Sequence, residues 1–132
     1  MLAQLEAQEE LLAGQIMFTT LANWVEDIVW VNDCEGRLLF INEAWVELTG
    51  LSLLQTAEFG WLKVIHPDEI QGLLDARVEQ FENGVPFERT YRVLTREGTY
   101  VQLSARTVPL KDSHGKIVRW FGMAIVDDGK DD

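Results

Sequence analysis

The chain has 132 residues, 47% of them hydrophobic, and it carries five Trp, six Phe and a single Cys. This length and composition predict one ordered domain with a packed core, and one cysteine excludes an internal disulfide or a cysteine-based metal cluster, so we expect no metal site. The net charge of −11 disfavours nucleic acid and anionic membrane surfaces as partners, and the lack of a signal peptide or of an apolar run near ~20 residues predicts a cytoplasmic protein without membrane contact by this segment.

The first predicted element is a helix over residues 2–16, which are rich in Leu, Ala, Gln and Glu. Glu9 interrupts its one apolar stripe, which is made of Leu2, Leu5, Leu12 and Ile16. Because a short helix with a single apolar stripe needs a packing partner, we expect it to cover part of this domain or to pair with the same helix of a second copy.

Two strands, over residues 28–33 and 37–42, follow the helix. The turn between them, Asp33-Cys34-Glu35-Gly36, combines an Asp that can hydrogen-bond its own backbone with a glycine that accepts positive φ. Residues 43–49 then predict a short helix with Asn42 as its N-cap and a glycine directly after its end.

A longer helix is predicted over residues 67–82. Ser52 and Gln55 form a capping-box pattern for one turn of helix before it, and His66-Pro67-Asp68-Glu69 is typical of a helix start. Its apolar stripe consists of Ile70, Leu73, Leu74, Val78 and Phe81.

Three successive strands, over residues 87–96, 99–110 and 116–126, complete the chain. Short glycine turns separate them, which is typical of antiparallel hairpins. The last strand is apolar on both faces, so both faces need cover. The central helices can cover only one face, and we expect the N-terminal helix or a second subunit to cover the other.

A series of motifs in fixed order spans most of the chain. Its members are Ile28 to Asp33 with Gly36, Ile41 to Trp45 with Leu48 to Gly50, Gly60 and Trp61, Ile65 to Asp68, Phe87 to Arg92, Gly98, Val108 to Leu110, Asp112, Gly115, and Trp120 to Gly122. This series resembles the PAS sensor domain, in the Trp-rich, His-Pro-Asp version found in bacterial histidine kinases and diguanylate cyclases, and the resemblance covers about residues 18–127.

The resemblance implies an α+β fold: a five-stranded antiparallel sheet of order 2-1-5-4-3 with short helices that form a cavity over one face. We therefore divide the chain into an N-terminal amphipathic helix for dimerisation or capping (1–17), a PAS domain (18–127) and an acidic tail (128–132). Many relatives end the last strand with Asp-Ile-Thr, where a signal passes to the next domain. Val126-Asp127-Asp128 stands at that place here, so we expect an altered exit contact.

Family resemblance and strand parity together predict the site residues. The candidate cavity or cofactor-binding residues are Trp30, Asn32, Phe40, Trp45, Trp61, Leu74, Val78, Tyr91, Val93, Leu103, Ala105, Trp120 and Ala124. The candidate dimer-interface residues are Leu2, Leu5, Leu12, Ile16, Phe121, Met123 and Ile125. Asn32, a polar residue among apolar ones, is expected either to bond the backbone or to orient a ligand. Four arginines are expected to be solvated or paired at the sheet rim: Arg89, Arg92, Arg106 and Arg119.

The resemblance also bears on cofactors. Flavin-binding relatives that form an adduct have a cysteine on the helices before the long helix, whereas Cys34 lies in a turn. Haem-binding relatives have a histidine inside the long helix, whereas residues 70–81 contain none and His66 is explained as a cap. We expect no cofactor, with the tryptophans filling or nearly filling the cavity. A small unidentified ligand and non-covalent FAD or FMN stay as alternatives, and haem is not expected.

These observations predict a sensory or protein-interaction module of a bacterial signalling protein, either a histidine kinase of a two-component system or a cyclic-dinucleotide enzyme. It would regulate an effector domain in the same longer chain through a conformational change linked to the cavity and to a homodimer. The alternatives are a ligand-free structural dimerisation module and a non-covalent flavin redox sensor. The sequence shows no evident trio of a nucleophile, a base and a group that orients the base, so we expect no enzymatic activity.

Overall fold

The body of the molecule is a single antiparallel sheet. The computed structural model describes residues 2–127, so the predicted acidic tail lies outside the described residues. Five strands pair in the order β2-β1-β5-β4-β3, as predicted. They are β1 (Ile28–Asp33), β2 (Leu38–Ile41), β3 (Phe87–Leu94), β4 (Tyr100–Lys111) and β5 (Ile117–Asp127).

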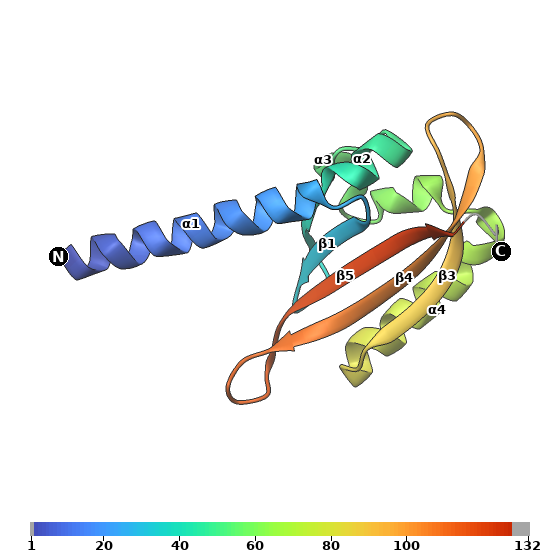
Figure 1. The fold of residues 1–132 in the computed structure, drawn as a ribbon. Helices are drawn as coiled ribbons and strands as arrows, with labels where there is room; N and C mark the ends of the chain where they lie inside the picture. Colours follow the sequence, from blue (N-terminus) through green and yellow to red (C-terminus); the bar gives the residue numbers. More distant parts are fainter. Residues whose placement is uncertain (1, 128–132) are drawn as a thin grey trace.

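Short helices cover one face of this sheet, here called the inner face (Figure 1). Along the chain they are α2 (Glu43–Thr49), α3 (Leu53–Thr56), the 3-10 helix η1 (Gly60–Val64) and α4 (Pro67–Asn83). The predicted side-chain caps of α3 and α4 are confirmed. Ser52 and Gln55 bond each other's backbone in both directions at α3, and His66 Nδ1 accepts a hydrogen bond of 3.1 Å from the backbone N–H of Asp68 at the start of α4.

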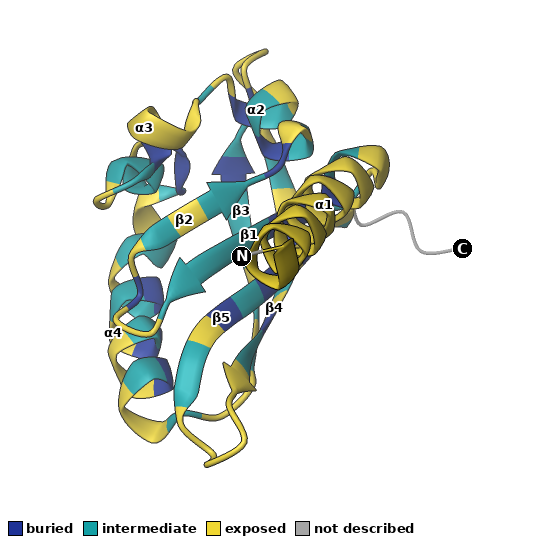
Figure 2. Ribbon diagram, turned by 90° about the vertical axis from the view of Figure 1, so that its left-hand side faces the viewer, coloured by how far each residue is buried: buried dark blue, intermediate teal, exposed yellow. Residues whose placement is uncertain are grey.

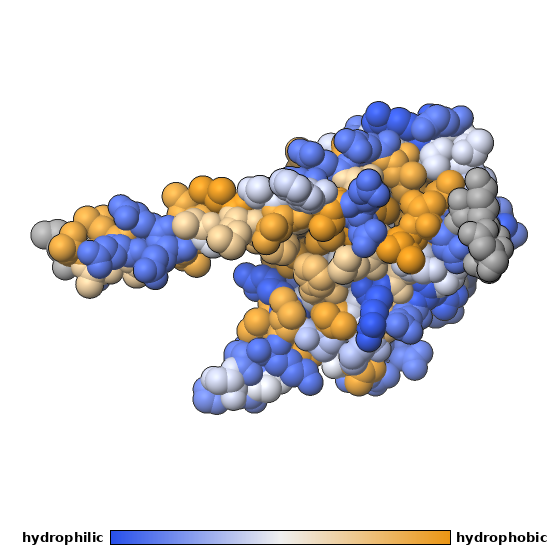
Figure 3. Space-filling view, viewed as in Figure 1, coloured by the Kyte–Doolittle hydropathy of each residue, from blue (hydrophilic) through white to orange (hydrophobic). Residues whose placement is uncertain are grey.

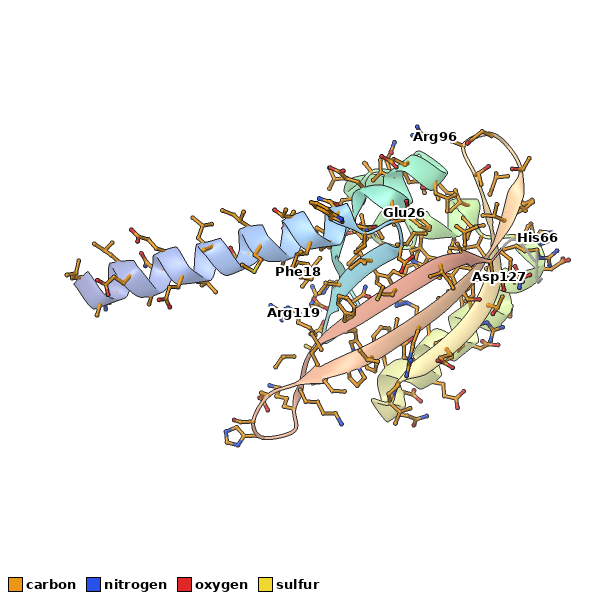
Figure 4. All side chains as sticks on the ribbon, in the orientation of Figure 1. Phe18, Glu26, His66, Arg96, Arg119 and Asp127 are labelled. Atoms are coloured by element: carbon orange, nitrogen blue, oxygen red, sulfur yellow. The ribbon has the colours of Figure 1, made fainter. Side chains whose placement is uncertain are left out.

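The N-terminal helix α1 (Leu2–Trp24) is longer than predicted and extends away from the sheet as a rod (Figure 1). It lies on the side of the sheet opposite α4, and nearly all of it is exposed (Figure 2). Only its last turns reach the body: Phe18 packs edge-on against Phe40 and Phe121, with ring centroids 5.3 and 6.5 Å apart. Figure 4 labels Phe18 at this junction. Within one chain α1 therefore covers only a small part of the sheet face opposite α4.

Asn42 joins α1 to the sheet. Its side-chain oxygen accepts a hydrogen bond from Val29 N (3.0 Å), and its Nδ2 donates to Ala22 O (2.7 Å) and Asp27 O (2.8 Å). Asn42 is the N-cap residue of α2, as predicted, but its side chain makes no cap bond to the helix, because it is bonded to the backbone groups where α1 meets β1. The first N–H of α2 bonds Asn23 Oδ1 instead, at 2.8 Å.

The two faces of the sheet differ in how well they are covered. On the inner face the core packs against the helices, with Val93 and Leu103 at its fully buried centre. On the outer face of β5, Met123 and Ile125 are 37% and 50% exposed. Figure 3 views this outer face and shows apolar surface running from the sheet onto α1. Apart from the contact with Phe18, the outer face is therefore an apolar surface left open by the described part of the chain.

Candidate ligand cavity

A cavity of about 530 Å³ lies between the inner face of the sheet and the helices α3, η1 and α4. This volume is in the range of small-molecule sites, which typically measure about 300–1,000 Å³. Several of the residues expected to form a cavity lie on its wall: Trp30, Asn32, Trp45, Trp61, Tyr91, Leu103 and Ala105. They come from β1, α2, η1, β3 and β4, so the wall is assembled from segments far apart in the sequence.

The remaining six candidates lie elsewhere. Phe40 is on the outer face, because an irregularity in the β1–β2 pairing lets both Ile41 and Leu38 face inward while Phe40 pairs with Val31. Its expected inward orientation is wrong. Three others are packed into the core with at most 1% exposure and do not line the cavity: Val93, Trp120 and Ala124.

The long helix presents a different face to the cavity than predicted. Leu74 and Val78 were expected to point inward, yet neither lines the cavity, and Val78 is 58% exposed. The cavity is lined from α4 by Leu73, Arg77, Gln80 and Phe81. A shift of one residue along a helix turns a side chain by about 100°. The apolar stripe of α4 includes both Leu73 and Leu74, so the pattern could not tell which of the two faces the cavity.

The expectation that the tryptophans fill the cavity is wrong: about 530 Å³ stays open, because their rings are held at its walls or, for Trp120, in the core. Trp30 lies over Gly122, where an added Cβ would stand only 2.5 Å from its Nε1. Trp45 donates its Nε1–H to Thr56 Oγ1 at 2.9 Å. Trp120 packs edge-on against Phe81, with centroids 5.1 Å apart. The absence of a side chain at Gly122 thus lets an indole lie on the sheet instead of rising into the open volume.

Polar groups interrupt the apolar wall at a few positions. Asn32 Nδ2 donates to Gly36 O at 3.1 Å, which fulfils the backbone alternative for this residue. Arg77 Nη2 donates to the same oxygen at 2.8 Å, and its guanidinium lies 5.3 and 4.9 Å from the rings of Phe59 and Phe81. Desolvation by burial lowers the pKa of Arg77. The sequence could have pointed to Arg77 only if the cavity-facing side of α4 had been placed one residue earlier, on Leu73 and Arg77 instead of Leu74 and Val78.

Two further wall residues carry polar groups in the protein interior. Burial raises the pKa of the Tyr91 phenol to about 12. Thr107 Oγ1 is buried and has no hydrogen-bond partner among the described residues. Such a group costs about 1–3 kcal/mol when left unpaired. Sequence reasoning did not select Thr107, because one threonine in a strand is ordinarily a surface residue.

The four arginines expected at the sheet rim divide into three that lie there and one that lines the cavity. Arg92 pairs with Glu69 and Arg106 with Glu88, each at 3.4 Å, and Arg119 bonds the neighbouring carbonyl of Val118 at 2.7 Å. Arg89, in contrast, is half-buried and lines the cavity.

Metal-ligating side chains do not gather at one place within residues 2–127. No cluster of three or more His, Cys, Asp or Glu side chains in this range is placed to hold a metal ion. Cys34 is exposed in its turn. Over the same residues, no helix is long and apolar enough to span a bilayer.

A five-stranded antiparallel sheet with a helix-covered cavity on one face defines a class of small sensory domains. A family model described as PAS fold matches residues 38–124, and the chain belongs to this family. Among curated proteins the chain is 28% identical over 95 residues to the uncharacterized protein y4lL of Sinorhizobium fredii. It is also 28% identical over 87 residues to the peroxide stress-activated histidine kinase mak1 of Schizosaccharomyces pombe. These matches cover 72% and 66% of this chain but only 11% and 5% of the relatives' length.

Solved structures agree with the fold. The N-terminal domain of a diguanylate cyclase with PAS/PAC sensor from Marinobacter aquaeolei superposes with a TM-score of 0.68 at 23% identity, covering 79% of this chain and 97% of that one. A domain of the putative light and redox sensing histidine kinase from Haloarcula marismortui gives a TM-score of 0.61 at 25% identity, covering 76% and 88%. The chain is thus a PAS sensor domain whose neighbours belong to signalling proteins.

Proposed function

We propose that this PAS domain binds a small molecule in its cavity and passes the binding event, through a homodimer, to an effector domain in the same longer chain. The observation that carries the proposal is the open volume of about 530 Å³ behind walls that are mostly apolar and aromatic. Pockets of this kind bury most of a small ligand's surface. The histidine kinase and diguanylate cyclase among its neighbours support a histidine kinase or a cyclic-dinucleotide enzyme as the output.

A second copy of the chain is the partner that the uncovered surfaces favour. Leu2, Leu5, Leu12 and Ile16 are all exposed along α1. At the base of α1 the stripe continues onto the outer face of β5, where Met123 and Ile125 are exposed. Apolar surface of this extent is typical of an interface. A homodimer that pairs α1 helices and covers the outer face would remove both from water.

The proposed route of the signal runs through residues that belong to both regions. Trp30 lines the cavity and lies over Gly122 of β5, and the opposite face of β5 contacts α1 through Phe121. Asn42 ties the end of α1 to β1. A ligand that moves Trp30 therefore acts on the strand to which α1 is attached. It shifts the dimer only if it binds one arrangement of α1 more tightly than the other.

Native mass spectrometry and an absorption spectrum of the purified protein test the binding part. We expect a bound or exchangeable small molecule, lost in Ala105→Phe, whose added ring occupies the cavity, and kept in the control Ala105→Ser. Absorption bands of an oxidised flavin would identify the flavin redox sensor instead. A protein that binds nothing across a metabolite panel, with unchanged melting in its presence, would establish the ligand-free dimerisation module and refute the proposal.

Light scattering on the full chain tests the dimer. The variant Leu5→Glu with Leu12→Glu places two charges on the apolar stripe, and we expect a monomer. The control, Gln4→Glu with Gln15→Glu, adds the same charge roughly 100° around the helix and should stay dimeric. Equal masses for the two variants would contradict α1 as the dimer contact.

A further inference from the structure

Arg89 is a cation inside an acidic protein. The chain carries a net charge of −11, yet Arg89 is half-buried on the inner face of β3 and lines the cavity. No ion pair or hydrogen bond joins its guanidinium to another described residue, whereas its strand neighbour Arg92 is paired with Glu69. Charges held away from water are ordinarily paired. The partner that Arg89 lacks among residues 2–127 would have to come from the cavity.

The other charged groups on the wall neither pair with Arg89 nor offer a ligand a second unpaired cation. Arg37 is paired with Asp33 and Glu35, so the acid at this end of the cavity is already neutralised. Arg77 is held by the carbonyl of Gly36 and by two aromatic rings. Glu58 lines the cavity too, but it is exposed and pairs with no described arginine. Within the described part of the chain, Arg89 is therefore the arginine of the wall that has neither an ion pair nor a hydrogen bond.

The helix opposite is shaped to receive this guanidinium. Gly72 of α4 faces Arg89: a Cβ at Gly72 would overlap Nη2 and lie 3.4 Å from Cζ. A residue with a side chain would displace the guanidinium, so the glycine leaves it room between β3 and α4. Thr107, diagonal to Arg89 across the β3–β4 pairing, adds a buried hydroxyl that has no partner among residues 2–127. Thr107 itself lines the cavity.

The rest of the wall selects the other part of the ligand. Trp30, Phe59, Trp61, Phe87 and Tyr91 surround the open volume. Aromatic walls favour flat rings in stacked or edge-on contact. The guanidinium fork matches a carboxylate in two parallel hydrogen bonds. We infer that the cavity takes a small aromatic carboxylate, with its rings between the aromatic walls and its carboxylate on Arg89; this rests on the proposed function that the cavity binds a ligand.

Calorimetry with three probes tests the inference: naphthylacetate, its neutral analogue naphthylacetamide, and acetate. We expect naphthylacetate to bind the wild-type protein more tightly than the amide, and acetate not to bind measurably. Arg89→Gln should weaken naphthylacetate by about ten- to hundredfold, the loss of a charged hydrogen-bonded partner, and leave the amide within about twofold. Gly72→Ala should likewise weaken naphthylacetate and spare the amide, because the added methyl group displaces the guanidinium. Alanine also has a higher helix propensity than glycine, so this variant should fold.

Arg106→Gln is the matched control, since Arg106 lies on the adjacent strand, is exposed and pairs with Glu88. It should change neither affinity. Equal affinity of the acid and the amide for the wild-type protein would overturn the carboxylate assignment while leaving a ligand cavity in place. Failure of both aromatic probes to bind would overturn this inference and count against the proposed function as well. If Arg106→Gln weakened naphthylacetate as much as Arg89→Gln does, the effect would come from the protein's overall charge and not from a contact with Arg89. That result would also overturn the inference.

Discussion

Gly122→Ala is the substitution whose effect follows most directly from the cavity wall. The added Cβ would stand 2.5 Å from Trp30 Nε1, whereas non-bonded heavy atoms settle near ~3.5 Å. The indole must therefore move by about 1 Å or more, and the open direction is the cavity. Overpacking of this kind costs about 1–3 kcal/mol. For a domain of this size that lowers the melting temperature by about 4–12 °C.

Thermal and urea unfolding of the variant measure this cost, and a double-mutant cycle assigns it. Trp30→Phe replaces the indole by a smaller ring, so adding Gly122→Ala to Trp30→Phe should cost less than half of what it costs alone. Ligand affinity should fall in Gly122→Ala as well, because the displaced indole occupies part of the cavity.

Gly14→Ala is the control, since nothing lies within 4 Å of a Cβ at Gly14 on the exposed helix α1. This change should leave stability unchanged or raise it by up to about 1 kcal/mol. If Gly122→Ala were as stable as the wild type, or if its cost stayed the same in the Trp30→Phe background, the arrangement of Trp30 over Gly122 would be refuted.

Two further predictions concern buried polar groups. Asn42→Ala should lower the free energy of unfolding by about 3 kcal/mol, because it leaves one N–H and two carbonyls at the α1–β1 junction unpaired. Asn23→Ala, which removes one exposed cap of α2, should lower it by only about 1 kcal/mol. Equal losses for the two variants in urea unfolding would contradict this ranking. Burial raises the pKa of Tyr91 from 10.0 to about 12, so the folded state keeps a proton that the unfolded chain releases. Stability should therefore fall between pH 10.0 and about 12, and Tyr91→Phe should abolish this fall. In a Tyr100→Phe background, phenolate absorbance near the unperturbed pKa would speak against a buried Tyr91.

The sequence by itself determined the elements whose signals are local. The turn Asp33–Gly36 closes with Asp33 Oδ1 accepting from Glu35 N and Arg37 N, each at 2.9 Å, and with Gly36 at φ 89°. The starts of α3 and α4 likewise rest on bonds between residues two or three positions apart. Partners this close in the chain are readable from residue type and spacing, so the turns and the helix starts could be predicted directly. The strand order, which rests on pairings between distant residues, was predicted only through the family resemblance.

Only the tertiary structure decided which side chains face the cavity and whether it is open. Phe40 faces outward because of an irregular pairing with β1. Trp30 lies flat because Gly122, which is far along the chain, has no side chain. Arg89 has room because Gly72 faces it from α4. An unfilled volume is the sum of many such contacts between distant residues, and a change of one methyl group in any of them alters it. The periodicity of one segment therefore does not predict the volume that stays open.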